Sequence, residues 1–409
     1  MSNTLSVIDM VAKEALRLAH EKATFIGTID RSYDDSFAKT GAKIGSTLRV
    51  RNPNAYTRRT GSRIMDVQDT TETTQTITVA TQDGVDLRFN SAELTMDIDE
   101  LSRRYIEPAM SVLVSGIDGD CLRTATQETY NLVGTAGTKI GTVTSGFSDT
   151  SALGLARAKL NQFLAPKDKN RSFQCDSVTM ASIANGIKGL FTPESEVNRA
   201  WREGFIAQTA LATFYENERT YSHTVGSDVT VATSSSSGAT DGGTTITMNG
   251  SDGSVKKGDI FTLPKVFACH PETKRSTGEL MQFVCTADST GAITVSPPTI
   301  WSGPKQNVCT AASAACTVAD FDSETMTFVG TAATAYRHNL MYHQDAFTFV
   351  TADLPLMDDA HKCVRMNKDG LSLRVWQASD IRNDELLMRI DILYGFKTLR
   401  PEWACRITN

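Results

Sequence analysis

The sequence lacks the short motifs that identify common enzyme classes. It contains no Gly-x-Ser-x-Gly nucleophile elbow, no His-Glu-x-x-His metal-binding motif and no phosphate-binding loop. Gly134, Gly137 and Gly141 match neither the dinucleotide-binding fingerprint nor a phosphate loop, so they are interpreted as turn residues. Acids such as Asp118 and Asp120 are interpreted as solvated surface groups. We therefore predict no catalytic residues, no cofactor and no enzyme activity.

The eight cysteines never form a Cys-x-x-Cys pair. Four of them fall between Cys269 and Cys316, and His270 follows the first. Structural zinc sites normally take their ligands in closely spaced pairs, which this region does not offer. His338 and His343 have no glutamate between them, so they do not form a metalloprotease motif either. The prediction is reduced, mostly buried thiols and no metal site.

Neither a secretory signal nor a long apolar run is evident. The N-terminus has no basic region followed by an apolar core, and no run approaches the ~20 apolar residues of a membrane-spanning helix. We therefore expect a soluble, cytosolic protein that does not enter a membrane. The net charge of −6 disfavours sequence-independent binding to nucleic acid, which needs clustered Lys and Arg. The 409 residues are enough for two or three domains with a substantial core.

The longest helical pattern runs from Asp97 to Tyr130. Its apolar residues recur at helical spacing and form a wide face that includes Met110 and Leu113. Pro108 interrupts this pattern, because an interior proline loses a backbone hydrogen bond and costs ~3 kcal/mol, whereas the first helical turn accepts proline. We therefore expect a short helix followed by a bend or a restart near Glu107.

The chain before this helix alternates between polar and apolar residues. Residues 6–22 predict an amphipathic helix, and residues 27–45 predict an extended connection. Three alternating runs at 46–51, 73–81 and 85–89 then predict a long β-hairpin. Because a two-stranded hairpin is marginally stable in water, it is expected to rest on another part of the protein or on a neighbour.

The first half of this predicted hairpin is basic, and acids follow closely. Three interpretations are open: a solvated loop, a contact surface for another protein subunit, and a nucleic-acid surface. The last is disfavoured because the nearby acids would repel phosphate. The candidate inter-subunit contact residues are Arg49, Arg51, Arg58, Arg59, Arg63, Asp66, Asp69 and Glu72.

The remaining chain reads as an α/β region interrupted by a β-rich stretch. The elements predicted before the interruption are helices over 151–163, 180–190 and 194–209 and a strand over 172–180. The strand candidates between 223 and 335 are TTITM, DIFTLPKVF, LMQFVCT, AITVS and TMTFV. Their spacing predicts a small inserted β-barrel or sandwich. A helical and mixed pattern then resumes, and Lys368-Asp369-Gly370 signals a hairpin followed by further strands.

Four stretches carry a family resemblance: DRSYDDSFAKTGAKIGSTLRVRNPNAYTRRTG, QDTTETT, YIEPAM and RIDILYGFKTLRPEWACRI. With this order of parts, the chain resembles the major capsid (coat) proteins of tailed double-stranded DNA bacteriophages. It resembles in particular the short-tailed phage subfamily whose core carries an inserted β-barrel domain. The resemblance implies an α+β protein with the major capsid protein fold of tailed phages and herpesviruses.

That fold would divide the chain into six parts. They are an N-terminal arm (1–45), an extended loop hairpin (46–92), a peripheral domain with a long spine helix (93–148), the first part of the axial domain (149–222), an inserted β-barrel-like, all-β domain (223–335) and the second part of the axial and peripheral core (336–409). Because shells of this family expand when DNA is packaged, the bend at Pro108 is where a conformational difference is expected.

The resemblance also implies the function. The expected protein is a structural major capsid protein that self-assembles into pentamers and hexamers of an icosahedral phage head. Its expected partners are other copies of itself, a scaffolding protein, a portal protein and packaged double-stranded DNA without sequence-specific contacts. It would assemble in the host bacterial cytoplasm and reside in the virion. The alternatives are another phage structural or adhesive protein whose β insert binds a surface ligand, and an enzyme with an unrecognised site that uses Asp118 or His343.

Overall fold

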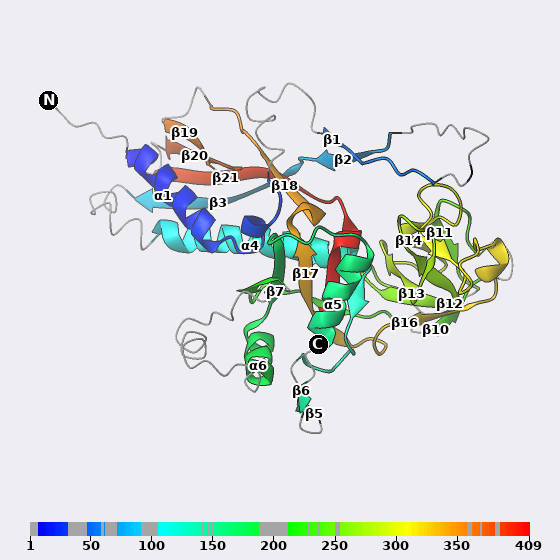
Figure 1. Ribbon diagram of the computed structural model, residues 1–409. Helices are drawn as coiled ribbons and strands as arrows, with labels where there is room; N and C mark the ends of the chain where they lie inside the picture. Colours follow the sequence, from blue (N-terminus) through cyan, green and yellow to red (C-terminus); the bar gives the residue numbers. More distant parts are fainter. Residues whose placement is uncertain are drawn as a thin grey trace. The chain divides into compact units, whose positions relative to one another are not determined.

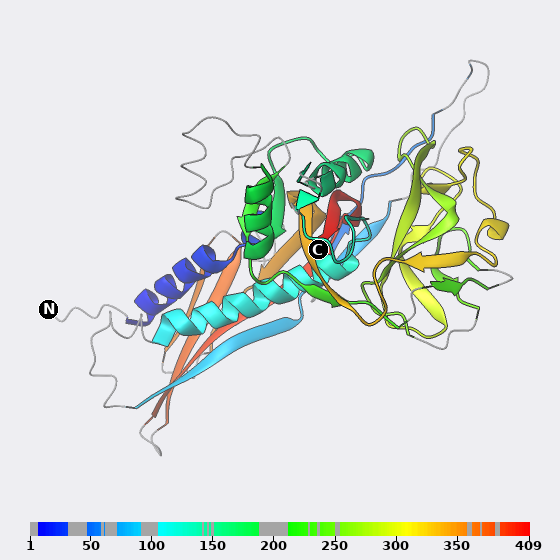
Figure 2. The ribbon, with the colours of Figure 1, turned by 90° about the horizontal axis from the view of Figure 1, so that it is seen from below.

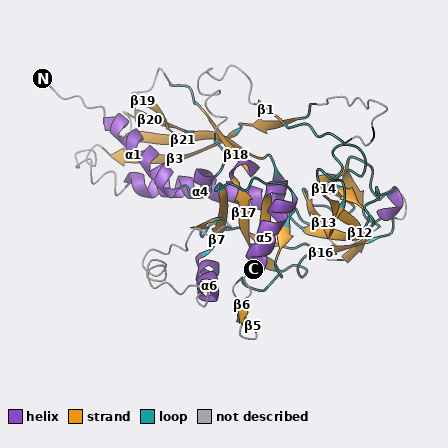
Figure 3. Ribbon diagram, viewed as in Figure 1, coloured by secondary structure: helices purple, strands orange, loops and turns teal. Residues whose placement is uncertain are grey.

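The computed structural model shows two compact units. It describes residues 7–31, 47–58, 61, 72–90, 105–140, 143–144, 147–148, 151–187, 212–227, 230–234, 238–249, 254–357, 362–368, 370–380 and 385–409. The first unit comprises Met1–Arg51, Thr74–Cys121 and Phe347–Leu399, and the second comprises Asn52–Thr73, Leu122–Ala346 and Arg400–Asn409. Both contain helices and largely antiparallel sheets, which confirms the predicted α+β class (Figure 3).

The first unit is built on a five-stranded antiparallel sheet. Its order is β18-β21-β20-β19, with β3 paired to the other side of β21. The strands are β3 (Thr81–Asn90), β18 (Phe347–Ala352), β19 (Lys362–Lys368), β20 (Leu371–Asp380) and β21 (Glu385–Thr398). Strands β19 and β20 confirm the hairpin predicted around Lys368-Asp369-Gly370, since Lys368 of β19 pairs with Leu371 of β20.

Two helices lie along this sheet, α1 (Val7–Lys22) and α4 (Glu107–Glu128) (Figure 2). Helix α1 confirms the predicted amphipathic helix, because its buried residues recur every three or four positions, as at Val11, Ala15 and Leu18. Residues of α1, α4, β20 and β21 together line a small apolar cavity, so the apolar faces of the helices pack toward the sheet.

Helix α4 corresponds to the predicted spine. The α-helix begins at Glu107, and Pro108 therefore lies in its first turn, where a missing backbone N–H removes no intrahelical bond. The predicted apolar face is buried at Met110 and Leu113. Residues 97–104, where we expected a preceding helix, lie outside the described part of the chain. The bend at Pro108 stays a prediction.

Only two of the three alternating runs form the predicted hairpin. Strand β1 (Thr47–Arg51) pairs antiparallel with β2 (Thr74–Thr78). The third run was wrongly placed in the hairpin, because β3 instead pairs over ten residues with β21, from Asn90 opposite Glu385 to Thr81 opposite Tyr394. A period of two identifies a strand, but it does not identify the distant strand that satisfies its backbone hydrogen bonds.

The second unit contains a six-stranded mixed sheet in the order β4-β22-β17-β7-β8, with β9 also paired to β17. The strands are β4 (Leu132–Val133), β7 (Arg171–Cys175), β8 (Thr213–Glu216), β9 (Ser222–Thr224), β17 (Ala335–His343) and β22 (Ala404–Thr408). A separate short pair joins β5 (Val143–Thr144) to β6 (Phe147–Ser148). The helical pattern expected after residue 335 was wrong, because β17 and β18 are strands joined by a 3-10 turn, Gln344–Ala346.

Two helices of this unit follow the predictions with one shift. Helix α5 (Ser151–Gln162) confirms the helix predicted over 151–163. The strand predicted over 172–180 ends early, because helix α6 (Ser177–Ile187) begins where Asp176 accepts a hydrogen bond from the N–H of Thr179 at 3.4 Å. The helix predicted over 194–209 lies outside the described residues.

A seven-stranded antiparallel sheet occupies the β-rich stretch, in the order β10-β16-β12-β13-β14-β11, with β15 paired to β12 (Figure 1). The strands are β10 (Thr230–Ala232), β11 (Gly243–Thr247), β12 (Ile260–Cys269), β13 (Ser276–Cys285), β14 (Ala292–Thr299), β15 (Val308–Cys309) and β16 (Thr325–Phe328). All five strand candidates of the sequence are therefore confirmed.

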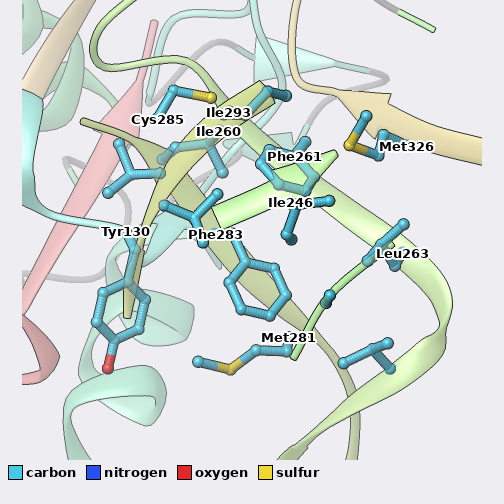
Figure 4. Close-up of a cluster of buried hydrophobic side chains, with 14 of the residues drawn as sticks. Tyr130, Ile246, Ile260, Phe261, Leu263, Met281, Phe283, Cys285, Ile293 and Met326 are labelled. Atoms are coloured by element: carbon cyan, nitrogen blue, oxygen red, sulfur yellow. The ribbon is translucent and has the colours of Figure 1, made fainter. Parts of the chain in front are cut away.

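The interior of this sheet is continuous with the end of helix α4. Phe261 and Phe283 stack with ring centroids 5.7 Å apart, and Ile246, Ile293 and other alternating residues surround them (Figure 4). Tyr130, two residues beyond α4, belongs to the same buried cluster. Strand β16 shows the alternation expected for a sheet with one buried face, since Met326 and Phe328 are buried and Thr325 and Thr327 are exposed.

Candidate functional site

The stem of the β1–β2 hairpin is anchored by its inward side chains. Val50 and Ile77 are buried in a small apolar cluster that also contains Val350 and Leu399. The side-chain amide of Gln75 donates to the carbonyl of Leu399 at 3.0 Å. The stem therefore rests on the first unit, which supplies the support that an isolated hairpin lacks.

A glycine in β21 permits this close approach. A Cβ atom built on Gly395 would lie 2.4 Å from the carbonyl oxygen of Thr78, the last residue of β2. That separation is far below van der Waals contact, so any other residue would force the two strands apart. Gly395 thus fixes where the hairpin leaves the sheet.

The outward face of the stem carries the candidate contact residues. Arg49 and Arg51 are both exposed and lie opposite Thr76 and Thr74 in the pairing register. Their neighbours in the alternation point inward, so both guanidinium groups are presented on the same face. The planar fork of an arginine matches a carboxylate, which makes this face suited to acidic side chains of another molecule.

Two of the other candidates, Arg58 and Glu72, lie within the described residues. Arg58 and Glu72 are exposed, and the backbone ladder continues past β1 with the N–H of Asn52 donating to the carbonyl of Thr73 at 2.9 Å. In the second unit, Lys305 Nζ donates to Thr73 Oγ1 at 2.9 Å. The remaining candidates lie outside the described residues: Arg59, Arg63, Asp66 and Asp69.

A second exposed surface, which was not predicted from the sequence, lies on the sheet of the first unit. Arg389 donates two hydrogen bonds to the carboxylate of Asp86, at 2.6 and 2.9 Å, and these lower the pKa of Asp86. A groove of about 310 Å³ opens beside this pair and is lined in part by Trp376 and Leu387, the latter 45 % exposed. The sequence does show alternating charged and apolar residues in β3 and β21. This pattern predicts an exposed charged surface only once the pairing of the two strands is known.

The residues kept for the enzyme alternative have structural contacts. Asp118 is buried in α4, and its Oδ1 accepts hydrogen bonds from the backbone N–H groups of Phe25 and Ile26 at 2.9 and 3.0 Å. In the second unit, His343 Nε2 lies 3.0 Å from a carboxylate oxygen of Asp168, and its ring packs edge-on against Trp403. Each residue is thus occupied in holding its own part of the fold.

The cysteines are free, and all but Cys363 are buried. Burial raises the pKa of the Cys121 and Cys285 thiols well above the ordinary value, so both stay protonated and unreactive at neutral pH. Within the described residues, no group of three or more His, Cys, Asp or Glu side chains is placed to hold a metal ion. No helix in the same residues is long and apolar enough to cross a membrane.

The second unit also holds a buried polar cluster that no sequence pattern indicated. His223 Nε2 donates to Asp259 Oδ1 at 2.6 Å, and both side chains are buried. The guanidinium of Arg406 is buried nearby, and desolvation lowers its pKa to about 9, which leaves it protonated at neutral pH. Residues from three distant parts of the sequence therefore meet, which single-sequence patterns cannot show.

Comparison with known proteins gives one family match. The model described as "P22 coat protein - gene protein 5" matches residues 53–406. No curated protein has a significant match to the sequence.

Solved structures that resemble the fold of this chain include three from phages. The chain is similar to a structure titled "Mycobacterium phage Che8", with 10% sequence identity, coverage of 94% of this chain and 90% of that chain, and a TM-score of 0.49. It is also similar to a capsid structure of cyanophage P-SCSP1u, with 11% sequence identity, coverage of 90% of this chain and 84% of that chain, and a TM-score of 0.43. A third similar structure is the capsid of Myoviridae phage XM1, with 9% sequence identity, coverage of 91% of this chain and 87% of that chain, and a TM-score of 0.37. Because these likenesses are weak, the family assignment is drawn from the match over residues 53–406.

Proposed function

The chain belongs to the P22 coat protein family, and on this premise we propose that it assembles into the pentamers and hexamers of an icosahedral bacteriophage head that encloses double-stranded DNA. The family match over residues 53–406 carries this conclusion. The protein is a structural major capsid protein, and membership implies a structural, non-enzymatic role. As a coat protein it forms homo-oligomers and resides in the capsid of the virion.

The basic hairpin is the proposed contact between neighbouring subunits. Arg49 and Arg51 project from a stem that is anchored by Val50 and Ile77, so the backbone that carries them is held in place before a neighbour arrives. Their proposed partners are acidic side chains of the adjacent subunit. A single exposed ion pair contributes only ~0–1 kcal/mol. A shell repeats each contact many times, so the small contributions of single pairs together determine whether the shell is stable.

The remaining partners follow from the same proposal. A scaffolding protein guides assembly in the host bacterial cytoplasm, a portal protein occupies one position in the shell, and packaged DNA makes no sequence-specific contacts. The acidic net charge of −6 supports a container that is filled from outside, because the chain has no excess of basic residues to neutralise packaged phosphates.

The proposed division of the chain follows the parts predicted from the sequence. The seven-stranded sheet supports an inserted domain over 223–335, and the β1–β2 pair supports an extended loop that begins near residue 46. The start of α4 at Glu107 supports a spine helix whose proposed bend lies at Pro108.

Co-expression tests this function. The chain is produced alone and together with its scaffolding protein, and the products are separated by sedimentation and viewed by negative-stain microscopy. We expect closed, rapidly sedimenting shells when both proteins are present. Soluble monomers or dimers under every condition would contradict the proposal. Charge reversal of Arg58 and Arg59 to glutamate should reduce the yield of shells while the circular dichroism spectrum of the subunit stays unchanged.

A further inference from the structure

A small cavity of about 10 Å³ lies among the polar residues of the second unit. Its lining includes Arg406 and Thr408 of the C-terminal strand β22, His338 of β17, His223 of β9, and Gly258 and Asp259 of the turn before β12. Elements of the six-stranded sheet therefore meet the seven-stranded sheet at this point. The chemistry of the cavity depends on which of these polar atoms are already paired.

Arg406 is the central residue. It is 1 % exposed, its Nε donates to the carbonyl of Thr129 at 2.7 Å, and its Nη1 donates to the carbonyl of Gly258 at 2.8 Å. Among the described residues, no protein atom accepts a hydrogen bond from its Nη2. A buried N–H of a charged group is rarely left without an acceptor, so Nη2 points to a bound acceptor.

Two further side chains of the lining offer unpaired polar atoms. Thr408 Oγ1 and His338 Nδ1 are buried, and neither has a hydrogen-bond partner within the described part of the chain. His338 lies opposite Thr408 in the β17–β22 pairing, and Leu340 lies opposite Arg406. Because side chains alternate between the two faces of a sheet, Arg406, Thr408 and His338 all project from the same face.

The charge of the site is balanced without an added ion. Asp259 supplies the negative charge, and its carboxylate accepts hydrogen bonds from His223 Nε2 at 2.6 Å, from the N–H of Lys256 at 2.8 Å and from the N–H of Gly226 at 3.1 Å. The carboxylate thus already has its donors, whereas Arg406 still needs an acceptor. The occupant must be neutral, small, and able both to accept and to donate hydrogen bonds.

We propose that one water molecule binds in this cavity, accepts a hydrogen bond from Arg406 Nη2 and bonds to Thr408 Oγ1 and His338 Nδ1. The volume suits a single water, and three polar partners are the usual number for a buried one. The water completes the bonding of an arginine that already joins the end of α4 to the turn before β12. Together with its bound water, Arg406 thus stabilises the contact between the six-stranded sheet and the seven-stranded sheet.

A crystal structure or shell reconstruction that resolves ordered water tests the site directly. We expect one density peak within hydrogen-bond distance of Arg406 Nη2, Thr408 Oγ1 and His338 Nδ1. The same crystals soaked in bromide should show no anomalous signal there. A bromide peak would identify an anion site and overturn the proposal, as would a structure in which Nη2 bonds to a protein atom and the cavity holds no density.

A pair of variants tests the contribution of the water. Thr408→Ser keeps the hydroxyl, whereas Thr408→Val keeps the shape and removes it. From the usual worth of one hydrogen bond, Thr408→Val should raise the unfolding equilibrium constant about fivefold, and Thr408→Ser should stay within about twofold of the natural protein. Equal effects of the two substitutions would show that the hydroxyl contributes no bond to a water and would overturn this role.

Discussion

The buried carboxylate of Asp118 is predicted to fasten the N-terminal segment to the spine helix. Its Oδ1 accepts hydrogen bonds from the N–H groups of Phe25 and Ile26, at 2.9 and 3.0 Å, and Asp118 is 0 % exposed. The ring of Phe25 is also buried and lies 5.7 Å from that of Phe347. Asp118 therefore links the turn after α1 to helix α4, while Phe25 packs against the sheet of the first unit through Phe347 and Phe396.

The expected loss of stability in Asp118 variants follows from those two hydrogen bonds. A hydrogen bond to a charged acceptor contributes about 1.5–3 kcal/mol, so Asp118→Ala should lower the free energy of unfolding by about 3–6 kcal/mol. Asp118→Asn keeps an oxygen acceptor but loses its charge, and neutral bonds are about half as strong, so it should cost about half as much. Asp120→Ala, an exposed position on the same helix, is the matched control and should change stability by less than about 0.5 kcal/mol.

The assay combines urea unfolding of the soluble subunit with hydrogen exchange of the Phe25 and Ile26 amides. Exchange at these two amides should accelerate in the order natural protein, Asp118→Asn, Asp118→Ala. If Asp118→Ala unfolds at the same urea concentration as Asp120→Ala and both amides keep their protection, the anchoring role of Asp118 is refuted.

Three further predictions concern the hairpin and the buried histidine. Gly395→Ala places a Cβ 2.4 Å from the last carbonyl of β2 and should destabilise the subunit by about 1–3 kcal/mol in thermal unfolding, whereas Gly27→Ala, with no atom within 4 Å, should have little effect. Arg49→Glu combined with Arg51→Glu should leave the unfolding midpoint unchanged and lower the yield of sedimenting shells; unchanged yield would count against the contact. Burial depresses the pKa of His338 below the unfolded value, so the neutral ring stabilises the fold above pH ~6.5, and this stability is lost as the pH falls below that value, by up to about 1.4 kcal/mol per pH unit. His338→Asn should flatten this part of the stability–pH curve, and an unchanged curve would contradict the assignment.

The sequence was informative wherever one element could be recognised by its own period. Helices α1 and α5 and the five strand candidates of the seven-stranded sheet lie where the patterns placed them. Pro108 was interpretable for the same reason, because its cost depends only on its place within one helix.

Contacts between residues that are distant in the sequence could not be predicted from the period of a single element. The partner of β3 lies about three hundred residues further along the chain, and the pattern of VDLRF contains no information about it. Asp118 looked like a surface acid because its partners are backbone N–H groups, which every residue but proline carries. Arg406 gave no signal because its acceptors are the carbonyl groups of Thr129 and Gly258.

A three-dimensional reconstruction of the particles formed on co-expression with the scaffolding protein would show whether the protein builds a capsid. We expect a closed icosahedral shell of pentamers and hexamers, with the β1–β2 hairpin of each subunit against its neighbour and carboxylates near Arg49 and Arg51. Particles without icosahedral order, or a shell in which the hairpin contacts only its own subunit, would contradict this expectation.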